Sequence, residues 1–208
     1  MRVKVASLVA IIVILCTSLS FASVVSNFDD GTLDGWTASG DGSISNPGSG
    51  GNPGGFLKAT DPATGPNTWG IAPSKFLGDW SSLNGAGFIS FDMILLSGGP
   101  PTTEKPNVYI SGPGGSAICF ADNKITSLWQ TFVFPIAESM WEIKGGSWNT
   151  LLTNVTELKV DLEQIQGKEV TGIDNVVLSQ VPIPGAIWLL SSALIGLICG
   201  RRVSRAWG

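Results

Sequence analysis

The stretch that decides the fold is residues 51–92, which read GNPGGFLKATDPATGPNTWGIAPSKFLGDWSSLNGAGFISFD. Residues 88–95 carry a large apolar side chain at every odd-numbered position, and this period of two is typical of a strand with one buried face. Two shorter extended segments precede it, at residues 56–60 and 69–73, and each is bounded by glycine, proline, asparagine or aspartate. The middle of the chain is therefore predicted to be antiparallel β-structure.

The flanking sequence predicts more short strands separated by turn residues. Residues 39–55 are rich in glycine, serine, proline and asparagine and are predicted to be largely loop and turn. Single helical turns are predicted at residues 136–141 and 149–154. The remaining strands are predicted at residues 24–28, 107–111, 117–120, 129–134, 158–162 and 170–179. Many short strands at this spacing indicate an all-β fold, a jelly roll or β-sandwich.

The N-terminal 22 residues are predicted to be a secretory signal peptide. Arg2 and Lys4 precede an uncharged apolar run, and small residues at positions 20 and 22 precede the expected cleavage site. This segment is expected to form a signal helix that directs the chain through the inner membrane.

The C-terminal residues 181–208 are predicted to be a membrane-anchoring tail. Residues 185–200 are uncharged, and Arg201 and Arg202 follow them. As a helix this run is about 24 Å long at a rise of ~1.5 Å per residue, somewhat short of the ~30 Å hydrocarbon core of a bilayer. We expect a transmembrane helix whose arginines stay in the cytoplasm.

Residues 23–180 are predicted to form one folded domain with a sizeable core. They carry seven lysines against sixteen carboxylates, a net charge of −9, so binding to nucleic acid is not expected. The chain has no histidine, which excludes histidine-based triads and imidazole zinc sites. Cys119 is the one cysteine of this segment, so an internal disulfide is excluded.

Two short motifs near the ends of the domain suggest a metal site. The sequences NFDDG at residues 27–31 and GIDNVVL at residues 172–178 resemble the termini of jelly-roll modules of the carbohydrate-binding and galactose-binding-like type. The resemblance implies that the end strands lie side by side. It also implies that Asp29 and Asp174, with nearby backbone oxygens, hold a structural calcium ion. The alternative is that both aspartates only cap turns.

A longer resemblance covers residues 28–179. The segment APSKFLGDWS within residues 69–92, followed by LWQTFVFPI and GIDNVVLS in the same order, is similar to the laminin B type domain, also called laminin domain IV. This likeness implies an extracellular β-sandwich without catalytic activity. It does not imply a ligand.

The tail resembles the PEP-CTERM class of bacterial sorting signals in its VPxPxxxWL form. Val181, Pro182 and Pro184 supply the motif, and the apolar run and the two arginines follow it. The resemblance implies an exosortase-type sorting enzyme as a partner. Ile183 stands where this class usually has glutamate, so the sequence leaves open whether the tail is cleaved; the alternative is a plain membrane anchor.

Candidate ligand-binding residues are the aromatic ones. Trp69 and Trp80 flank predicted loops, and an exposed indole can stack on the apolar face of a sugar; the alternative is that both rings fill the core. A paired-carboxylate glycosidase site would have to use Asp92, Glu138 or Glu142, but no spacing defines a pair.

The sequence therefore predicts a non-enzymatic, secreted or cell-surface binding or structural protein of a bacterium. It is expected to be anchored transiently in the membrane and to end at the cell surface or in an extracellular polysaccharide matrix. One alternative is a calcium-stabilised carbohydrate-binding module, and another is a polysaccharide-active enzyme.

Overall fold

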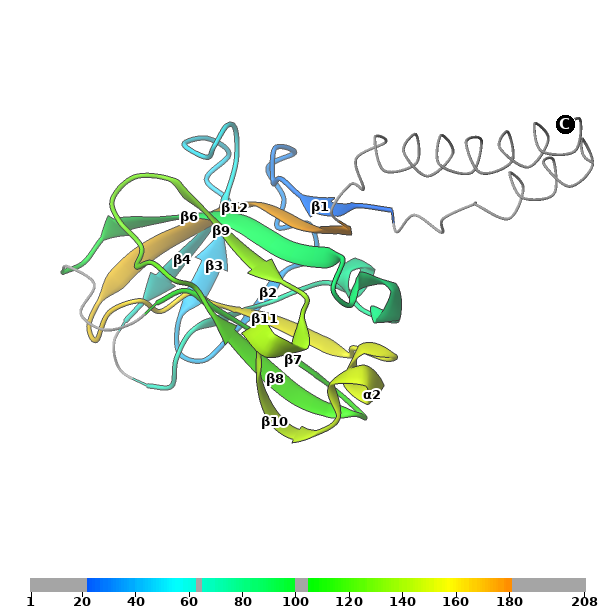
Figure 1. The fold of residues 1–208 in the computed structure, drawn as a ribbon. Helices are drawn as coiled ribbons and strands as arrows, with labels where there is room; N and C mark the ends of the chain where they lie inside the picture. Colours follow the sequence, from blue (N-terminus) through cyan, green and yellow to red (C-terminus); the bar gives the residue numbers. More distant parts are fainter. Residues whose placement is uncertain (1–21, 63–64, 100–104, 181–208) are drawn as a thin grey trace, which may run out of the picture.

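The computed structural model describes residues 22–62, 65–99 and 105–180 (Figure 1). Their strands form two antiparallel sheets stacked face to face, so the predicted all-β sandwich is confirmed. The predicted signal helix and membrane helix belong to the chain ends, which lie outside the described residues.

Sheet A has six strands, and its two longest, β6 and β12, lie next to each other near the middle. The strand order is β3-β4-β12-β6-β9, and the first strand, β1, pairs with the last, β12, as the jelly-roll resemblance implied. The strands of sheet A are β1 (Val24–Ser26), β3 (Ser43–Ser45), β4 (Leu57–Asp61), β6 (Gly87–Ser97), β9 (Gln130–Pro135) and β12 (Glu169–Gln180).

Sheet B also has six strands, in the order β10-β8-β7-β11-β5-β2. The predicted hairpin is present as β7 and β8, joined at Gly112 and Gly115. The strands of sheet B are β2 (Thr37–Ser39), β5 (Trp69–Ile71), β7 (Asn107–Gly112), β8 (Gly115–Phe120), β10 (Glu142–Gly146) and β11 (Glu157–Asp161).

Three strands, β2, β3 and β10, were not expected from the sequence. Each is short and consists mainly of small, polar or charged residues, so none has enough apolar alternation to be distinguished from a loop. The helical turns near the predicted positions are η3 (Glu138–Met140) and α2 (Trp148–Leu152), and two more, η1 (Ser74–Phe76) and η2 (Ser81–Leu83), lie between β5 and β6.

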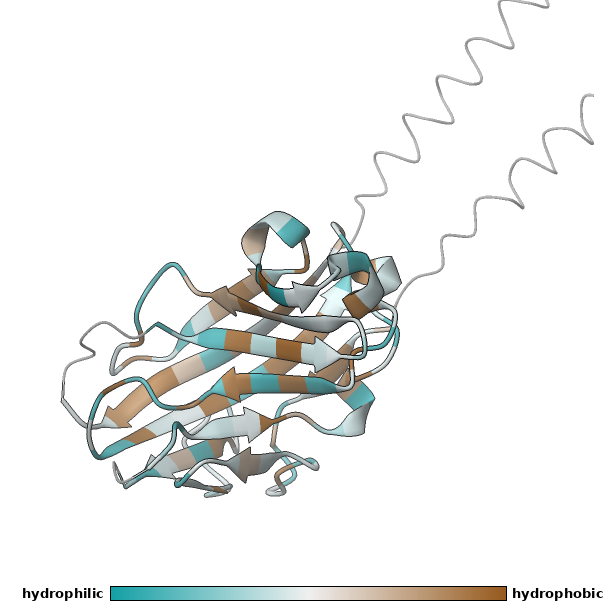
Figure 2. Ribbon diagram, turned by 90° about the horizontal axis from the view of Figure 1, so that it is seen from below, coloured by the Kyte–Doolittle hydropathy of each residue, from teal (hydrophilic) through white to brown (hydrophobic). Residues whose placement is uncertain are grey.

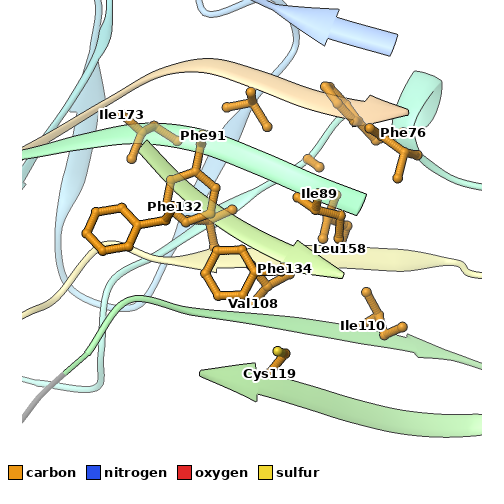
Figure 3. Close-up of a cluster of buried hydrophobic side chains, with 14 of the residues drawn as sticks. Phe76, Ile89, Phe91, Val108, Ile110, Cys119, Phe132, Phe134, Leu158 and Ile173 are labelled. Atoms are coloured by element: carbon orange, nitrogen blue, oxygen red, sulfur yellow. The ribbon is translucent and has the colours of Figure 1, made fainter. Parts of the chain in front are cut away.

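The core lies between the two sheets. The odd-numbered side chains of β6 from Ile89 to Leu95 point into it and are at most 8% exposed, as the alternation predicted. The rings of Phe91 and Phe134 stack with their centroids 5.3 Å apart, and Val108, Ile110 and Cys119 of sheet B face them (Figure 3). Burial raises the pKa of the Cys119 thiol to about 11, so this cysteine is a core residue and not a reactive one.

Strand β12 has a bulge directly after Asp174. Asp174 pairs with Asp92 and Val177 pairs with Ser90, so β12 has one residue more than β6 between these two pairs. Asn175, inside the bulge, has a left-handed backbone with φ of 50°. A bulge of this kind bends a strand and changes the direction of its side chains.

Candidate functional site

Asp174 is the centre of the first candidate site, on the outer face of sheet A. Its side chain is fully buried. The backbone N–H of Asn52 donates to Oδ2 at 2.6 Å, and the backbone N–H of Asn175 donates to Oδ1 at 2.7 Å. Asn52 belongs to the loop of residues 46–55, which we call the 46–55 loop. Asp174 therefore holds this loop against the sheet.

Asp92, opposite Asp174 on β6, binds the same loop through side chains. The amide Nδ2 atoms of Asn52 and Asn175 donate to its Oδ2 at 3.1 and 2.9 Å, and the hydroxyl of Thr131 donates to its Oδ1 at 2.5 Å. Asn175 Nδ2 also donates to the carbonyl of Asn52 at 2.5 Å. The two carboxylates are thus embedded in N–H and O–H donors.

Asp29 approaches the same loop from the other end of the chain. A Cβ at Gly54 would lie 1.8 Å from Asp29 Oδ1, and a Cβ at Gly51 would lie 2.8 Å from Asp174 Oδ2. Only glycine leaves room for the loop backbone to pass this close to both carboxylates. The structure therefore places both predicted calcium ligands against one loop, although Asp29 is exposed and Asp174 is buried.

The electrostatic environment of Asp174 favours its neutral form. Burial is the main reason that its pKa is raised above the ordinary value, and the negative charges of Asp29 and Asp92 raise it further. The two backbone N–H donors act in the opposite direction. An added cation would relieve the same repulsion.

The fit of these residues to calcium rests on hard oxygen donors. Asp29 and Asp174 supply carboxylates, while the carbonyls of Phe28 and Thr32 already accept from the side-chain amide of Asn46 at 2.8 and 2.6 Å. Within residues 22–62, 65–99 and 105–180, no three acidic, cysteine or histidine side chains converge with metal-binding geometry. A calcium ion here would depend on two carboxylates and backbone oxygens.

The second candidate site concerns the two tryptophans. Trp80 is 1% exposed, and its indole N–H donates to the carbonyl of Phe76 at 3.0 Å. Because a sugar ring cannot reach a side chain inside the core, the expectation that Trp80 is a stacking platform does not agree with the structure. Trp69 is half-buried and lies on β5.

Trp69 belongs to a set of aromatic residues on the outer face of sheet B, a sheet whose strands alternate hydrophilic and hydrophobic residues (Figure 2). In β5 the neighbouring Gly70 faces the core, so the Trp69 ring points outward. Tyr109 on β7 and Phe120 on β8 alternate with buried neighbours and point the same way, and Phe120 is 47% exposed. The sequence analysis missed these two rings, because each stands alone in a short strand.

Charged groups lie among these rings. The ammonium of Lys159 lies 5.4 Å from the centre of the Tyr109 ring and 2.8 Å from Oε1 of Glu157. Glu157 also accepts the hydroxyl of Ser111 at 3.0 Å. On the edge strand, Glu142 pairs with Lys144. The face therefore offers both hydrogen-bond donors and acceptors beside its aromatic rings.

Asn107 and Asp161 form a buried polar pair on the same side of sheet B. Asn107 Nδ2 donates to Oδ2 of Asp161 at 2.6 Å, and both side chains are at most 5% exposed. Asn107 Oδ1 has no hydrogen-bond partner among the described residues. A buried acceptor without a donor is unusual in a folded protein and is a place where a buried water molecule can bind.

The carboxylates considered for glycoside hydrolysis lie on three different elements. Asp92 is buried and hydrogen-bonded in the loop contact, Glu138 lies in η3, and Glu142 pairs with a lysine on β10.

The sorting residues Val181, Pro182, Pro184, Arg201 and Arg202 lie outside the described residues. Every helix within the described part of the chain is too short or too polar to cross a membrane.

Comparison with known proteins identifies solved structures with the same fold. No protein-family model matches the sequence, and no curated protein matches it either. A family 11 carbohydrate-binding module of a cellulosomal cellulase of Clostridium thermocellum is 17% identical, with a TM-score of 0.53, over 78% of this chain and 96% of the module. The tandem of family 22 modules from Paenibacillus barcinonensis is 18% identical, with a TM-score of 0.52, over 81% of this chain and 49% of the tandem.

The L4b domain of human laminin α-2 is also similar, with 9% identity and a TM-score of 0.44 over 56% of this chain and 71% of that one. This score is too low to carry an argument. At these identities the comparisons establish the sandwich fold alone. The matched modules are non-catalytic, and other matched chains come from enzymes, such as an exo-β-agarase of which 24% is covered.

Proposed function

We propose that this protein is a non-enzymatic, secreted or cell-surface binding protein that holds a glycan chain on the outer face of sheet B. The observation that supports this most directly is that Trp69, Tyr109 and Phe120 lie on the same outer face of sheet B. The C–H face of a sugar packs on an aromatic ring, and successive rings along a sheet suit an extended chain. The carbohydrate-binding modules with the same fold support the proposal by analogy only.

The chemistry of the face favours an uncharged glycan. Glu142, Glu157 and Asp161 supply carboxylates there against Lys144 and Lys159, and the whole domain is strongly acidic. An anionic polymer on this face would be repelled. Sugar hydroxyls, in contrast, can donate to Glu157 and accept from Lys159.

Affinity electrophoresis of the full-length protein in gels containing neutral polysaccharides tests this site. Tyr109→Ala and Trp69→Ala are each expected to weaken binding about tenfold, because a well-packed aromatic contact contributes roughly 1–1.5 kcal/mol beyond its area. Leu128→Ala is the matched control, since Leu128 is 73% exposed and lies outside this face. Unchanged binding by both aromatic variants, with their thermal unfolding intact, would overturn the proposal.

The same experiment separates binding from catalysis. A non-enzymatic module leaves the polysaccharide intact, so no new reducing ends are expected after prolonged incubation. Release of reducing sugar that is lost with a carboxylate substitution would support the polysaccharide-active enzyme instead.

A structural calcium ion between Asp29 and Asp174 is the second element of the proposal. The ion would be held by these carboxylates and by backbone oxygens of the turn after β1, and it would neutralise their repulsion and tie the 46–55 loop to both chain ends. If calcium binds only the native state, it stabilises by about 2.7 kcal/mol at a hundredfold excess over Kd. We expect a rise in melting temperature with calcium that a chelator reverses and that Asp174→Ala abolishes.

Export and sorting complete the proposal. Residues 1–22 direct secretion through the inner membrane, and the tail anchors the chain until an exosortase-type enzyme recognises Val181, Pro182 and Pro184. Arg201 and Arg202 hold the end of the tail in the cytoplasm. The final position is then the cell surface or an extracellular polysaccharide matrix.

Cell fractionation tests this route. Replacing Pro182 and Pro184 together by alanine is expected to leave the protein in the membrane fraction, whereas the unaltered protein reaches the surface. Equal distribution of both proteins would exclude recognition of the motif.

A further inference from the structure

A groove of about 420 Å³ crosses the outer face of sheet A, on the opposite side of the sandwich from the aromatic residues of sheet B. One wall is the 46–55 loop with Phe56, and the floor is made by Lys58 of β4, Val170 of β12 and Leu96 of β6. The hollow arises beside Gly172, which pairs with Lys58 and brings no side chain of its own; the Phe56 ring packs over it.

The charge of this groove is opposite to that of the domain. Lys58 is its one charged lining residue, and no lining residue is acidic. No carboxylate and no other acceptor of the described residues pairs with the Lys58 ammonium, which is half-buried beside apolar side chains. The groove therefore offers an anion one positive charge and no negative charge among its lining residues.

The shape and the rim of the groove favour a sugar over an acyl chain. The groove is shallow and open to solvent along its length, whereas an acyl chain needs an enclosed apolar channel. The hydroxyl-bearing Ser49 and Ser97 lie on its rim, and both are exposed. Hydroxyl groups on the rim and apolar side chains on the floor match the two faces of a sugar ring.

We propose that this groove is a second glycan site, which binds a carboxylate-bearing sugar residue of an acidic polysaccharide through Lys58. Phe56 and Leu96 contact the apolar face of the ring, and the serine hydroxyls bind its hydroxyl groups. Since the two sites lie on opposite faces, one molecule can connect a neutral chain to an acidic chain. The second site does not depend on the first, because it shares no residue with the aromatic residues of sheet B.

Affinity electrophoresis of the full-length protein with polygalacturonate, compared with its fully methyl-esterified form, tests the proposal. The ester keeps the sugar backbone and removes the charge. Retardation is expected with the acid and not with the ester, and it should weaken as salt is added. Lys58→Met keeps the apolar stem and removes the ammonium, so binding should fall about fivefold.

Two further variants define the site. Lys159→Met removes a lysine from the opposite face and should leave polygalacturonate binding unchanged. Leu96→Asp puts a carboxylate on the groove floor at a position that is 43% exposed, so the fold should tolerate it while binding of the acid is lost. Tyr109→Ala must also leave this binding intact, which separates it from failure of the sheet B site.

The proposal is overturned if the protein is not retarded by polygalacturonate, or if the ester retards it equally. It is also overturned if Lys58→Met and Leu96→Asp both bind as the unaltered protein does. Binding of decanoate that both variants abolish, without binding of the polymer, would assign the groove to an acyl carboxylate and exclude the glycan.

Discussion

Two buried acidic side chains of the same strand, Asp174 and Glu169, differ in how their burial is compensated. Asp174 lies on the outer face of sheet A and receives one backbone N–H on each oxygen. Glu169 lies on the inner face, is 2% exposed, and receives the backbone N–H of Gln164 on Oε1 only. Its Oε2 has no hydrogen-bond partner within the described chain.

The neighbours of Glu169 increase this difference. Asp61 stands directly opposite on β4 and is equally buried. Burial is the main reason that the pKa of Glu169 is raised to about 8, and the charges of Asp61, Glu163 and Asp161 raise it further. Glu169 therefore carries a proton at neutral pH. Burial raises the pKa of both carboxyl groups, and the N–H donors, two for Asp174 and one for Glu169, act against it.

The largest expected effect is a pH dependence of stability that Glu169 causes. A carboxyl group whose pKa is raised on folding binds its proton more tightly in the native state, so stability is full below the unfolded pKa near 4.5 and falls as the pH rises towards 8. The slope in this window approaches about 1.4 kcal/mol per pH unit. Urea unfolding at several pH values measures it.

Glu169→Gln is the control for this prediction, because it keeps the shape and cannot ionise. Its stability should be nearly flat over the upper part of the window, and the decline that remains at lower pH belongs to Asp174. An identical decline in the variant would show that Glu169 is not the titrating group.

The second effect is the loss of the loop contact at Asp174. Asp174→Ala leaves two backbone N–H groups without an acceptor under the 46–55 loop, which should cost about 2–3 kcal/mol in the free energy of unfolding at neutral pH. Asp29→Ala, at an exposed position, should cost about 0.5 kcal/mol or less without calcium. Equal costs would contradict the claim that Asp174 holds the loop.

A third, smaller effect tests how closely the backbone of the 46–55 loop passes the Asp29 side chain. Gly54 and Gly48 have similar left-handed backbones, with φ of 82° and 78°, but a Cβ at Gly54 meets Asp29 while a Cβ at Gly48 meets nothing within 4 Å. Gly48→Ala should cost about 1 kcal/mol from backbone strain alone. Gly54→Ala should cost about twice that, as measured by thermal unfolding; equal costs would mean that Asp29 moves aside freely.

The smallest effect concerns the charge of Asp29. Since that charge contributes to the raised pKa of Asp174, Asp29→Asn should lower the pKa of Asp174 slightly, as measured by NMR titration of its carboxyl carbon. The pKa of Glu169 should not change. A shift at Glu169 instead would mean that the two carboxyl groups are not independent.

The alternation of apolar and polar residues was enough to predict most strands. In β6 and β11 the side chains with period two are those that enter the core, because a strand sends successive side chains to opposite faces. The short strands β2, β3 and β10 could not be predicted in this way. They are held by pairing with β5, β4 and β8, respectively, and pairing partners are not visible in a local pattern.

The candidate site residues also differ in whether a local sequence pattern could predict them. Asp29 and Asp174 were found from short motifs, and the structure brings both to one loop. Trp69 and Trp80 had the same appearance in the sequence, yet one lies on a sheet face and the other in the core. Tyr109, Phe120 and Lys58 carried no local signal.

The sequence by itself determined the all-β class and the acidic character of the domain, because side-chain alternation and charge are local properties of the chain. The tertiary structure alone decided which side chains share a face, since that depends on the order of the strands. It placed Trp69, Tyr109 and Phe120 on one side of the sandwich and Lys58 on the other. It also decided which donors reach each buried carboxyl group: Asp174 receives the N–H of Asn52, 122 positions away, and that of the adjacent Asn175, whereas Glu169 receives the N–H of Gln164, five positions away.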